Sequence, residues 1–583
     1  MQKNNIYLEH HAEYPWQFVD KDRTCHLMLR CFDKVDKIEV LYGDPFCFWP
    51  GAEKKPVLER MKVQLSWQAN GIVCYTAAVP MNTRKLRYHF EITSLEGTIF
   101  LLTEQGLIRP VEEEQIRPFF VPYVFETEKY LAPQWAEKIS WYQIFPERFH
   151  DEKGNQGGEK FLPGRENFFG GTLEGIREKI PYIKSLGIQG VYINPIFSSI
   201  SNHRYDIADY TKLDVRLGQE KDLKELVNAL HQSEIRIMLD GVYNHCGWDN
   251  SYWQNIRSHG KRSKYYNWFI IYDEQAVLHE PLSAFTDERM RTDPPYECFA
   301  FAANMPKWNT SNPEVMDFLI SQAEAWTINY HIDAWRLDVP DEINREFLYQ
   351  FRNRMKKIKP DLLIIGEIWN DGKAWMEKFL FDATMDYPLY FIVRDFALEH
   401  KDSLETFCQR IERYLFSLPE PTRGNQWGFC SNHDIPRALF LASGDYSAMK
   451  KAYFLTALFG GSISIYYGDE IGMTGGADPD NRRAMIWNER NWDNAMREYI
   501  KELLLFQKQY CQGSALRCLN IKSPEVAEVI LEKNGETIKV CITSKNKGYS
   551  IPQNQNDELI FGIAEKGLKE WNVSNGFAAW KIE

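Results

Sequence analysis

The chain has 583 residues, a formal net charge of −12 and 11 Cys without a repeated spacing. This length exceeds what one compact core holds, so several domains are expected, and the negative charge disfavours nucleic acids and anionic membranes as partners. The cysteine pattern argues against a disulfide framework and a cysteine-ligated zinc site, and no apolar run is long enough to span a bilayer.

The first 125 residues predict an antiparallel β-sandwich. Residues 1–15, MQKNNIYLEHHAEYP, have no apolar core of the kind that a secretory signal needs, so we expect a reduced, cytoplasmic protein. Short stretches of alternating apolar and polar residues follow, separated by polar turns, as in the strands of a sandwich. The clearest of these stretches are residues 25–32, 38–44 and 86–93. A connector rich in Pro and Glu, residues 109–122, indicates a domain boundary near residue 125.

Residues 126–503 predict an α/β fold, a closed (β/α)8 TIM barrel. From Trp141 onward, apolar runs of strand length alternate with amphipathic helical stretches such as residues 172–187 and 221–234. Eight strand–helix units in series are typical of such a barrel. The eight strand candidates are residues 141–145, 190–197, 235–245, 332–338, 362–369, 381–387, 426–434 and 463–470.

The connection after the third strand is too long for an ordinary barrel loop. Residues 246–312 are rich in Trp and Tyr, and a long aromatic excursion inside a compact domain predicts a subdomain over the functional site. Beyond residue 503 the alternating pattern returns, for example in residues 526–532 and 537–543. Residues 504–583 therefore predict a small C-terminal β-domain.

Polar residues stand at the C-terminal ends of four strand candidates, where the active sites of such barrels are assembled. They are Asn244, His245, Arg336, Asp338, Glu367, His433 and Asp434. A lone Asp at a strand end is usually a turn former or a helix cap, and a lone His is often a core residue. Their coincidence at four strand ends favours a functional site, with three carboxylic acids converging on one mouth of the barrel.

The two carboxyl groups of the fourth and fifth strands predict a pair with opposed environments. Arg336 and Asp338 are two residues apart and share one face of a strand, so the guanidinium is expected to keep Asp338 ionised. Glu367 stands among apolar neighbours, and partial burial is expected to raise its pKa. One ionised and one protonated carboxyl group are the usual pair for cleaving a glycosidic bond. Asp333 is interpreted as a polar end to the strand.

Four motifs carry these residues: DGVYNH (240–245), AWRLDVPDE (334–342), IGEIW (365–369) and SNHD (431–434). In this order they closely resemble the motifs of the α-amylase family, glycoside hydrolase family 13. Further stretches resemble its subgroup of neopullulanase, cyclomaltodextrinase and maltogenic amylase, and the N-terminal sandwich resembles the starch-binding-type domain of that subgroup. These stretches are residues 142–149, 194–210, 305–309 and 466–483.

The resemblance implies a role for each matching position. It assigns Asp338 as the nucleophile, Glu367 as the acid/base and Asp434 as the third carboxylate, which holds sugar hydroxyls and helps distort the ring. The remaining matches imply substrate contacts, with Tyr205 as an aromatic platform and Asp478 and Arg482 gripping the next sugar. The implied substrate-binding residues are Tyr205, His245, Arg336, His433, Asp478, Arg482, Glu342 and Trp369.

The activity that the resemblance implies is retaining hydrolysis of α-1,4 bonds in cyclodextrins, maltooligosaccharides or pullulan, with transglycosylation as a further outcome. Two alternatives stay open. One is an α-glucanotransferase that moves maltosyl units, and the other is a catalytically silent amylase-like protein that only binds sugar or protein. The three carboxylates argue against the silent scaffold.

Two departures from the subgroup bear on substrate and metal. Relatives usually read V-A-N-E after the nucleophile, whereas residues 339–342 read VPDE here, which affects the acceptor side of the cleft. The subgroup's calcium loop is rich in Asn and Asp, but residues 150–160 read HDEKGNQGGEK and Thr172 stands where relatives often have Asp. We therefore expect no required cofactor and no complete calcium site.

The N-terminal domain also bears on assembly. In relatives this domain packs against a neighbouring subunit and narrows the cleft. The resemblance therefore implies a homodimer, with an α-glucan oligosaccharide as the only other partner.

Overall fold

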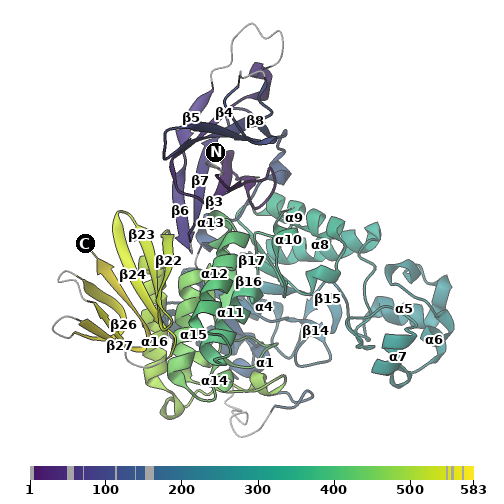
Figure 1. Ribbon diagram of the computed structural model, residues 1–583. Coiled ribbons are helices and arrows are strands. Elements are labelled where there is room, and N and C mark those ends of the chain that lie inside the picture. The colour runs from purple at the N-terminus through teal and green to yellow at the C-terminus, as the bar shows by residue number, and fades with distance from the viewer. Residues whose placement is uncertain are drawn as a thin grey trace.

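A computed structural model of the chain describes residues 6–48, 58–69, 71–111, 115–137, 139–151, 163–377, 379–545, 549–552, 557–566 and 570–582. Its centre is a nearly closed barrel of eight parallel strands (Figure 1). In spatial order the strands are β19 (Ala383–Thr384), β18 (Leu363–Gly366), β17 (Ala334–Leu337), β16 (Arg236–Gly241), β13 (Gly190–Ile193), β12 (Ser140–Ile144), β21 (Ser462–Tyr466) and β20 (Trp427–Phe429). A parallel bridge between Met385 and Trp427 joins the two ends of this sheet. The predicted barrel is confirmed. Six strands lie within their predicted runs, and β12 and β21 each begin one residue earlier, at Ser140 and Ser462.

The barrel strands are short and almost wholly buried because helices cover their outer face. Parallel strands need such a crossover between them, and the helices supply it. No helix in the described part of the chain is long and apolar enough to cross a membrane. The main covering helices are α2 (Leu173–Glu178), α3 (Ile180–Ser185), α4 (Glu220–Gln232), α8 (Pro313–Tyr330), α9 (Arg345–Ile358), α11 (Tyr387–Val393), α12 (Leu404–Ser417), α15 (Tyr446–Phe459) and α16 (Asn494–Phe506).

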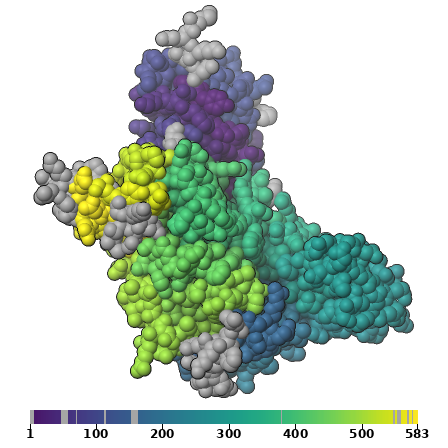
Figure 2. All heavy atoms as spheres, turned by 60° about the horizontal axis from the view of Figure 1, so that its bottom comes forward, coloured from purple at the N-terminus to yellow at the C-terminus, as the bar shows by residue number. Residues whose placement is uncertain are grey.

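The excursion after the third strand folds as a helical lobe beside the barrel, drawn in teal in Figures 1 and 2. Its helices are α5 (Ser251–His259), α6 (Glu274–His279) and α7 (Asp287–Thr292). The aromatic residues form its core, because Trp253, Tyr296 and Trp308 are fully buried. Where the lobe returns, the Trp308 backbone N–H donates to the Asn244 carbonyl at 3.0 Å, which fixes the lobe to the end of the third strand.

Two sheets form the N-terminal sandwich. The first contains β10 (Gly106–Ile108), β9 (Ile99–Thr103), β8 (Leu86–Ser94), β4 (Val35–Gly43), β5 (Glu59–Lys62) and β11 (Phe119–Val121). The second contains β1 (Leu8–Glu9), β2 (Gln17–Val19), β3 (Thr24–Cys31), β7 (Ile72–Pro80) and β6 (Gln64–Ala69). Alternate side chains of both sheets fill the core between them, as predicted from the alternating pattern.

The second sheet does not end with the sandwich. Its strand β6 pairs in parallel with β22 through Gln68–Cys518 and Ala69–Leu519, so that one sheet of eleven strands runs from the first domain into the last. The C-terminal strands are β22 (Ala515–Ser523), β23 (Val526–Lys533), β24 (Glu536–Thr543), β25 (Tyr549–Pro552), β26 (Glu558–Lys566) and β27 (Glu570–Ile582). The strand pattern of both terminal regions is as predicted, whereas the domain boundaries near residues 125 and 503 stay a prediction.

Asp333 lies at the N-terminal end of β17, on the opposite rim of the barrel from Asp338. Its buried carboxylate accepts hydrogen bonds from His231 and Lys359, each at 2.7 Å, and from the Ile237 backbone N–H at 3.0 Å. Hydrogen bonds from these donors outweigh burial and hold the pKa of Asp333 well below its usual range. The interpretation as a polar strand end is consistent with this geometry.

We expect Asp333→Asn to lower stability without affecting the site at the other rim. A depressed pKa in the folded state stabilises the fold above the unfolded pKa, near 4, and this stabilisation is lost as pH falls below it. Loss of the buried charge should therefore cost about 2–3 kcal/mol at pH 7 and less near pH 4. Chemical denaturation followed by circular dichroism at the two pH values measures the difference. Asp317→Asn, an exposed ion-pair partner of Arg354, is the control and should change stability by less than about 0.5 kcal/mol.

Candidate active site

The candidate site lies at the C-terminal ends of the barrel strands. Asp338 directly follows β17 and Glu367 directly follows β18, while Asp240 lies near the end of β16. The parallel ladder continues one residue past these strands, since the Asp338 N–H donates to Gly241 and the Glu367 N–H donates to Leu337, each at 3.0 Å. The backbone therefore fixes both predicted catalytic carboxyl groups at one rim of the barrel.

Arg336 is the charged centre of this site and is fully buried. Its Nη1 donates to Asp240 Oδ1 at 2.8 Å and to Asp338 Oδ1 at 2.7 Å. Its Nη2 lies 2.8 Å from Glu367 Oε2, an ion pair without hydrogen-bond alignment. One guanidinium thus holds three carboxylates, and it places Asp338 and Glu367 beside each other within reach of a single sugar ring.

Glu367 is held by donors on both of its oxygens. The Val339 backbone N–H donates to Oε2 and the Trp369 indole N–H donates to Oε1, each at 3.1 Å. Val339 adopts a left-handed backbone with φ of 43°, an unusual conformation for a β-branched residue. This turn directs its N–H toward Glu367, so the backbone after one carboxylate positions the other.

Burial raises the pKa of Asp338 well above its usual value, and the charges of Glu367 and Asp240 add to the effect. Arg336 acts in the opposite direction, as predicted from the sequence, but it does not outweigh burial. The predicted effect of Arg336 on Asp338 is therefore present, but burial opposes it and is the larger of the two. A single guanidinium is shared among three carboxylates, so its charge cannot offset all of them.

A hydrogen-bonded chain links Arg336 to the seventh strand. The Tyr205 hydroxyl lies 2.7 Å from Asp240 Oδ2 and 2.6 Å from His433 Nε2, and its ring lies parallel to the His433 ring with centroids 5.4 Å apart. Burial lowers the pKa of His433 well below its usual value, and the charges of Arg482 and Arg336 add to the shift. His433 is therefore a neutral imidazole that links Tyr205 to the third carboxylate.

Asp434 is the most accessible of the three predicted carboxyl groups. Its side chain is 27% exposed, and its Oδ2 lies 3.1 Å from His433 Nε2. Arg482 approaches from the loop after the eighth strand and lies 3.5 Å from Asp434 and 3.0 Å from Asp478. The structure thus brings the predicted Asp478–Arg482 pair to the same rim as the catalytic candidates.

His245 and Glu342 line the side of the site that faces the helical lobe. The His245 ring stacks on Phe299 of the lobe at 4.8 Å, and its buried Nε2 has no hydrogen-bond partner among the described residues. Glu342 Oε2 accepts from Asn244 and from Lys307, each at 3.0 Å. The lobe therefore supplies both a ring and a cation to this side.

Trp369 lies on the loop after Glu367 and is 39% exposed. Its ring stacks on the buried Tyr387 with centroids 4.1 Å apart, which leaves its outer face toward solvent. An exposed aromatic face held rigidly next to a carboxyl group is suited to contact with a sugar ring.

Sequence reasoning gave no role to several residues of the site. Asp240 was noted only as the start of a motif, yet it is the second acceptor of Arg336. Gln143 and Asn194 support His433 and Tyr205, each at 2.9 Å. A polar residue inside an otherwise apolar strand was the signal for all three, whereas nothing in the sequence pointed to the contact between Lys307 and Glu342.

No group of His, Cys, Asp and Glu suited to a metal ion occurs among the residues that the structure describes. Most of the loop predicted to lack a complete calcium site, residues 152–160, lies outside the described residues. Thr172 caps helix α2, with its hydroxyl accepting from the Gly175 N–H at 2.9 Å. The expectation about calcium stays a prediction.

Comparison with family models, known sequences and solved structures finds matches along most of the chain. The family described as "Alpha amylase, catalytic domain" matches residues 143–509, and "Alpha amylase, N-terminal ig-like domain" matches residues 1–125. A cyclomaltodextrinase from Geobacillus thermopakistaniensis is 35% identical and covers 95% of this chain and 93% of its own length. A maltogenic alpha-amylase from Bacillus acidopullulyticus is 33% identical, with coverage of 93% and 91%. A solved cyclomaltodextrinase structure superposes with a TM-score of 0.84 at 27% identity and 99% coverage of both chains.

We expect Asp434→Asn to raise stability at alkaline pH. Burial and the charge of Glu367 raise the pKa of Asp434 to about 7. A raised pKa in the folded state means that ionising Asp434 costs stability as pH rises from the unfolded pKa, near 4, through 7. Because the side chain is partly exposed, solvent screens this cost, and the thermal midpoint should rise by about 1–3 °C at pH 8.

Thermal unfolding at pH 5 and pH 8 measures the effect, which should be smaller at pH 5. Asp36→Asn, an exposed position in the N-terminal sandwich, is the control and should shift neither midpoint. A lower midpoint for Asp434→Asn at pH 8 would show that the ionised carboxylate stabilises the fold instead.

Proposed function

This chain belongs to the α-amylase family, and on that premise we propose that it cleaves α-1,4 bonds of cyclodextrins, maltooligosaccharides or pullulan with retention of configuration. The observation that carries the proposal is the shared guanidinium: Arg336 contacts both Asp338 and Glu367 at 2.7–2.8 Å. Retaining glycosidases need their two carboxyl groups about 5–5.5 Å apart, and two carboxylates on one guanidinium are suited to that short separation. The relatives are named cyclomaltodextrinase, maltogenic alpha-amylase and neopullulanase, which favours neither the transferase nor the silent scaffold.

The reaction would proceed in two steps. In the first, Asp338 attacks the anomeric carbon, the bond to the leaving oxygen breaks, and Glu367 donates a proton to that oxygen. In the second, Glu367 takes a proton from water, the water oxygen attacks the anomeric carbon, and the ester to Asp338 breaks. A sugar hydroxyl in place of water would give transglycosylation.

The proton of the buried pair must lie on Glu367 when attack begins. Burial raises the pKa of Asp338, while Glu367 accepts hydrogen bonds from Val339 and Trp369. A sugar oxygen bound beside Glu367 would favour the proton on that carboxyl group, next to the leaving oxygen.

The surrounding residues would bind the sugars on either side of the scissile bond. Tyr205 provides a flat face at the floor of the cleft, and Asp434 offers a partly exposed carboxylate for hydroxyl groups. Asp478 and Arg482 are proposed to hold the next sugar on the non-reducing side. Glu342, held by Lys307 and Asn244, would face the acceptor side.

An intracellular location and a homodimer are further parts of the proposal. A maltogenic amylase of Bacillus subtilis that is 33% identical is named as intracellular. The N-terminal sandwich carries an exposed aromatic patch, Phe46, Tyr123 and Phe125, which are 56%, 46% and 58% exposed. Lys85 Nζ lies 3.8 Å from the Phe46 ring centroid and 6.0 Å from that of Tyr123, so the patch is contiguous. Exposed apolar patches of this kind mark interaction surfaces.

The roles of the two carboxyl groups can be separated by the leaving group of the substrate. Asp338→Asn removes the attacking oxygen, so kcat/KM should fall by at least about a thousandfold on both maltotriose and dinitrophenyl α-maltoside. Glu367→Gln removes the proton donor, so kcat/KM on maltotriose should fall about 10²–10⁴-fold. The dinitrophenyl leaving group needs no proton, and its release by Glu367→Gln should be much less impaired. Steady-state kinetics on the two substrates measures both effects.

Asp333→Asn, at the opposite end of the same strand, is the matched control and should retain normal kcat. Near-normal hydrolysis of maltotriose by Asp338→Asn would overturn the assignment. A panel of β-cyclodextrin, pullulan and soluble starch with the native enzyme ranks the proposed substrates, and activity on none of them would reject the proposed function.

The aromatic patch of the N-terminal sandwich predicts the oligomeric state. The native protein should sediment as a dimer at micromolar concentration, and the double substitution Tyr123→Ser, Phe125→Ser should shift it to a monomer, because the patch would lose its apolar surface. Analytical ultracentrifugation measures the mass. Phe168→Ser, an exposed aromatic residue outside the sandwich, is the control. A native monomer at all concentrations would exclude this assembly.

A further inference from the structure

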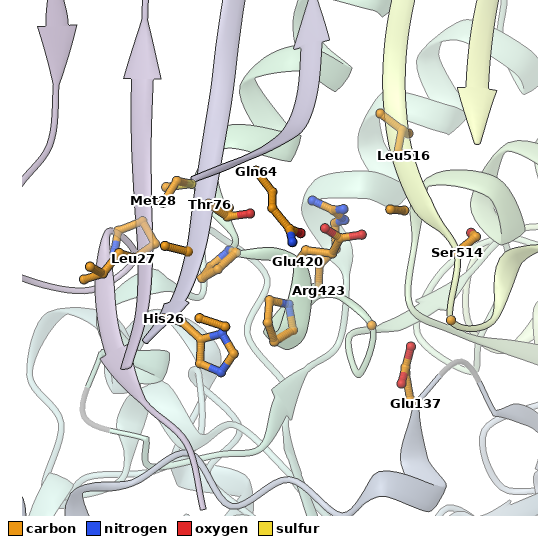
Figure 3. Close-up of a pocket in the computed structure, with 18 of the residues that line it drawn as sticks. His26, Leu27, Met28, Gln64, Thr76, Glu137, Glu420, Arg423, Ser514 and Leu516 are labelled. Carbon is orange, nitrogen blue, oxygen red and sulfur yellow. The ribbon is translucent and has the colours of Figure 1, made fainter. Parts of the chain in front are cut away.

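A cavity of about 710 Å³ lies where the three parts of the chain meet (Figure 3). The N-terminal sandwich lines it with strands β3, β6 and β7, the barrel with the segments before β20 and β21, and the C-terminal domain with the start of β22. Figure 3 shows Gln64 and Thr76 on the sandwich side, Glu420 and Arg423 on the barrel side, and Ser514 on the C-terminal side. This volume is within the range of sites that bind small molecules.

The cavity is distinct from the candidate active site. Its barrel residues Glu137, Gly424 and Gly460 precede strands β12, β20 and β21, so they lie at the N-terminal rim of the barrel. Asp338 and Glu367 follow the opposite ends of their strands. The length of the barrel strands separates the two sites, and no residue that lines the cavity belongs to the predicted catalytic set.

Arg423 supplies a guanidinium to the lining of the cavity. The residue is only 8% exposed, and no hydrogen bond or ion pair joins its guanidinium to any described residue. Burial raises the pKa of the Asp386 carboxylate and the charge of Arg423 opposes this shift, while none of the Arg423 nitrogens is among the fully buried described atoms that lack a hydrogen-bond partner. The guanidinium lines the cavity and is available there as a donor of several hydrogen bonds.

Two carboxylates in the same cavity determine which ligand fits. Among the described residues, the Glu420 carboxylate accepts a hydrogen bond only from the Ser66 hydroxyl, at 3.3 Å, and the Glu137 carboxylate has no hydrogen bond or ion pair. They would repel phosphate or another anion from Arg423. A neutral ligand that both donates and accepts hydrogen bonds can satisfy the guanidinium and the two carboxylates together. Hydroxyl groups have this property.

The other walls also suit a polyhydroxylated ring. Gln64, Thr76 and Ser514 supply further neutral polar groups. Phe18 and Met28 supply apolar surface, and the Phe18 ring stacks with His26 at 4.7 Å, which fixes the position of both rings. Flat apolar surface beside polar groups is the arrangement that sugar rings, with their C–H faces and hydroxyl rims, pack against.

We propose that this junction cavity binds a short neutral oligosaccharide, with Arg423 and Glu420 hydrogen-bonding its hydroxyl groups. That the oligosaccharide is an α-glucan rests on the proposed function. Because three parts of the chain contribute to the cavity, the bound sugar links the N-terminal sandwich and the C-terminal domain to the barrel. Binding to the folded state alone also stabilises the protein against unfolding.

The stoichiometry of maltotriose binding tests the proposal. Isothermal titration of the full-length Asp338→Asn protein, which cannot turn the sugar over, should show two equivalents of maltotriose. One equivalent occupies the candidate active site and the other the junction cavity. Adding Arg423→Met should remove one equivalent or weaken it at least tenfold, and Gln64→Ala should weaken the same equivalent. Arg177→Met, a surface Arg paired with Glu174, is the matched control and should retain both equivalents.

Thermal unfolding without sugar shows whether Arg423 serves to bind a ligand or to stabilise the fold. Arg423→Met should have an unchanged midpoint, because the substitution removes no hydrogen bond or ion pair between described residues. A lower midpoint would show that Arg423 stabilises the fold by itself and would overturn its assignment as a ligand-binding group.

The outcomes distinguish this inference from the proposed function. A single equivalent in the parent, unaffected by Arg423→Met, would reject the junction site while leaving glucan hydrolysis in place. An equivalent that depends on Arg423, in a native enzyme that hydrolyses no glucan, would support the junction site and reject the proposed function. Inorganic phosphate that displaces this equivalent would show that the cavity is an anion site and would overturn the proposal.

Discussion

The buried guanidinium of Arg336 is the interaction on which the rest of the site depends. It contacts carboxylates from three successive barrel strands, and it has no exposure to solvent. An arrangement with more anions than cations is tolerated only where the barrel fixes every partner in place, because each carboxylate brought out of water must find a donor. The ladder bonds that hold Asp338 and Glu367 at the rim, and the left-handed turn at Val339, are therefore part of the same constraint.

The two ends of strand β17 show how one barrel serves stability at one rim and chemistry at the other. At the N-terminal end Asp333 accepts bonds from several donors and its pKa is depressed. At the C-terminal end Asp338 shares a single guanidinium with other acids and its pKa is raised. The fold supplies Asp333 with a full set of hydrogen-bond donors. Asp338 has only a shared donor, so a bound substrate could add favourable interactions to it. The fully paired carboxylate at the N-terminal rim stabilises the barrel. The C-terminal rim can therefore hold a group of carboxylates that outnumber their cation.

The barrel could be predicted from the sequence because the apolar runs of its strands, such as residues 362–369, have the length and burial that parallel strands require. The positions of Asp338, Glu367 and Asp434 at one rim followed from the same pattern together with the family resemblance. The raised pKa of Asp338 could not be predicted, since it depends on burial and on how many carboxylates share Arg336, and Asp240 was not recognised as one of them. The pairing of β6 with β22 could not be predicted either. Alternating apolar and polar residues indicate a strand, but they do not indicate with which other strand it pairs.

That pairing has a consequence for how the chain can be divided. The contact between β6 and β22 consists of Gln68–Cys518 and Ala69–Leu519, which are 450 residues apart, and it covers an edge strand of each domain. Neither end of the protein is therefore an independent module. Removing the sandwich would uncover a bare sheet edge on the C-terminal domain, and a shortened chain would be prone to self-association through that edge, even though its barrel and its catalytic groups were complete.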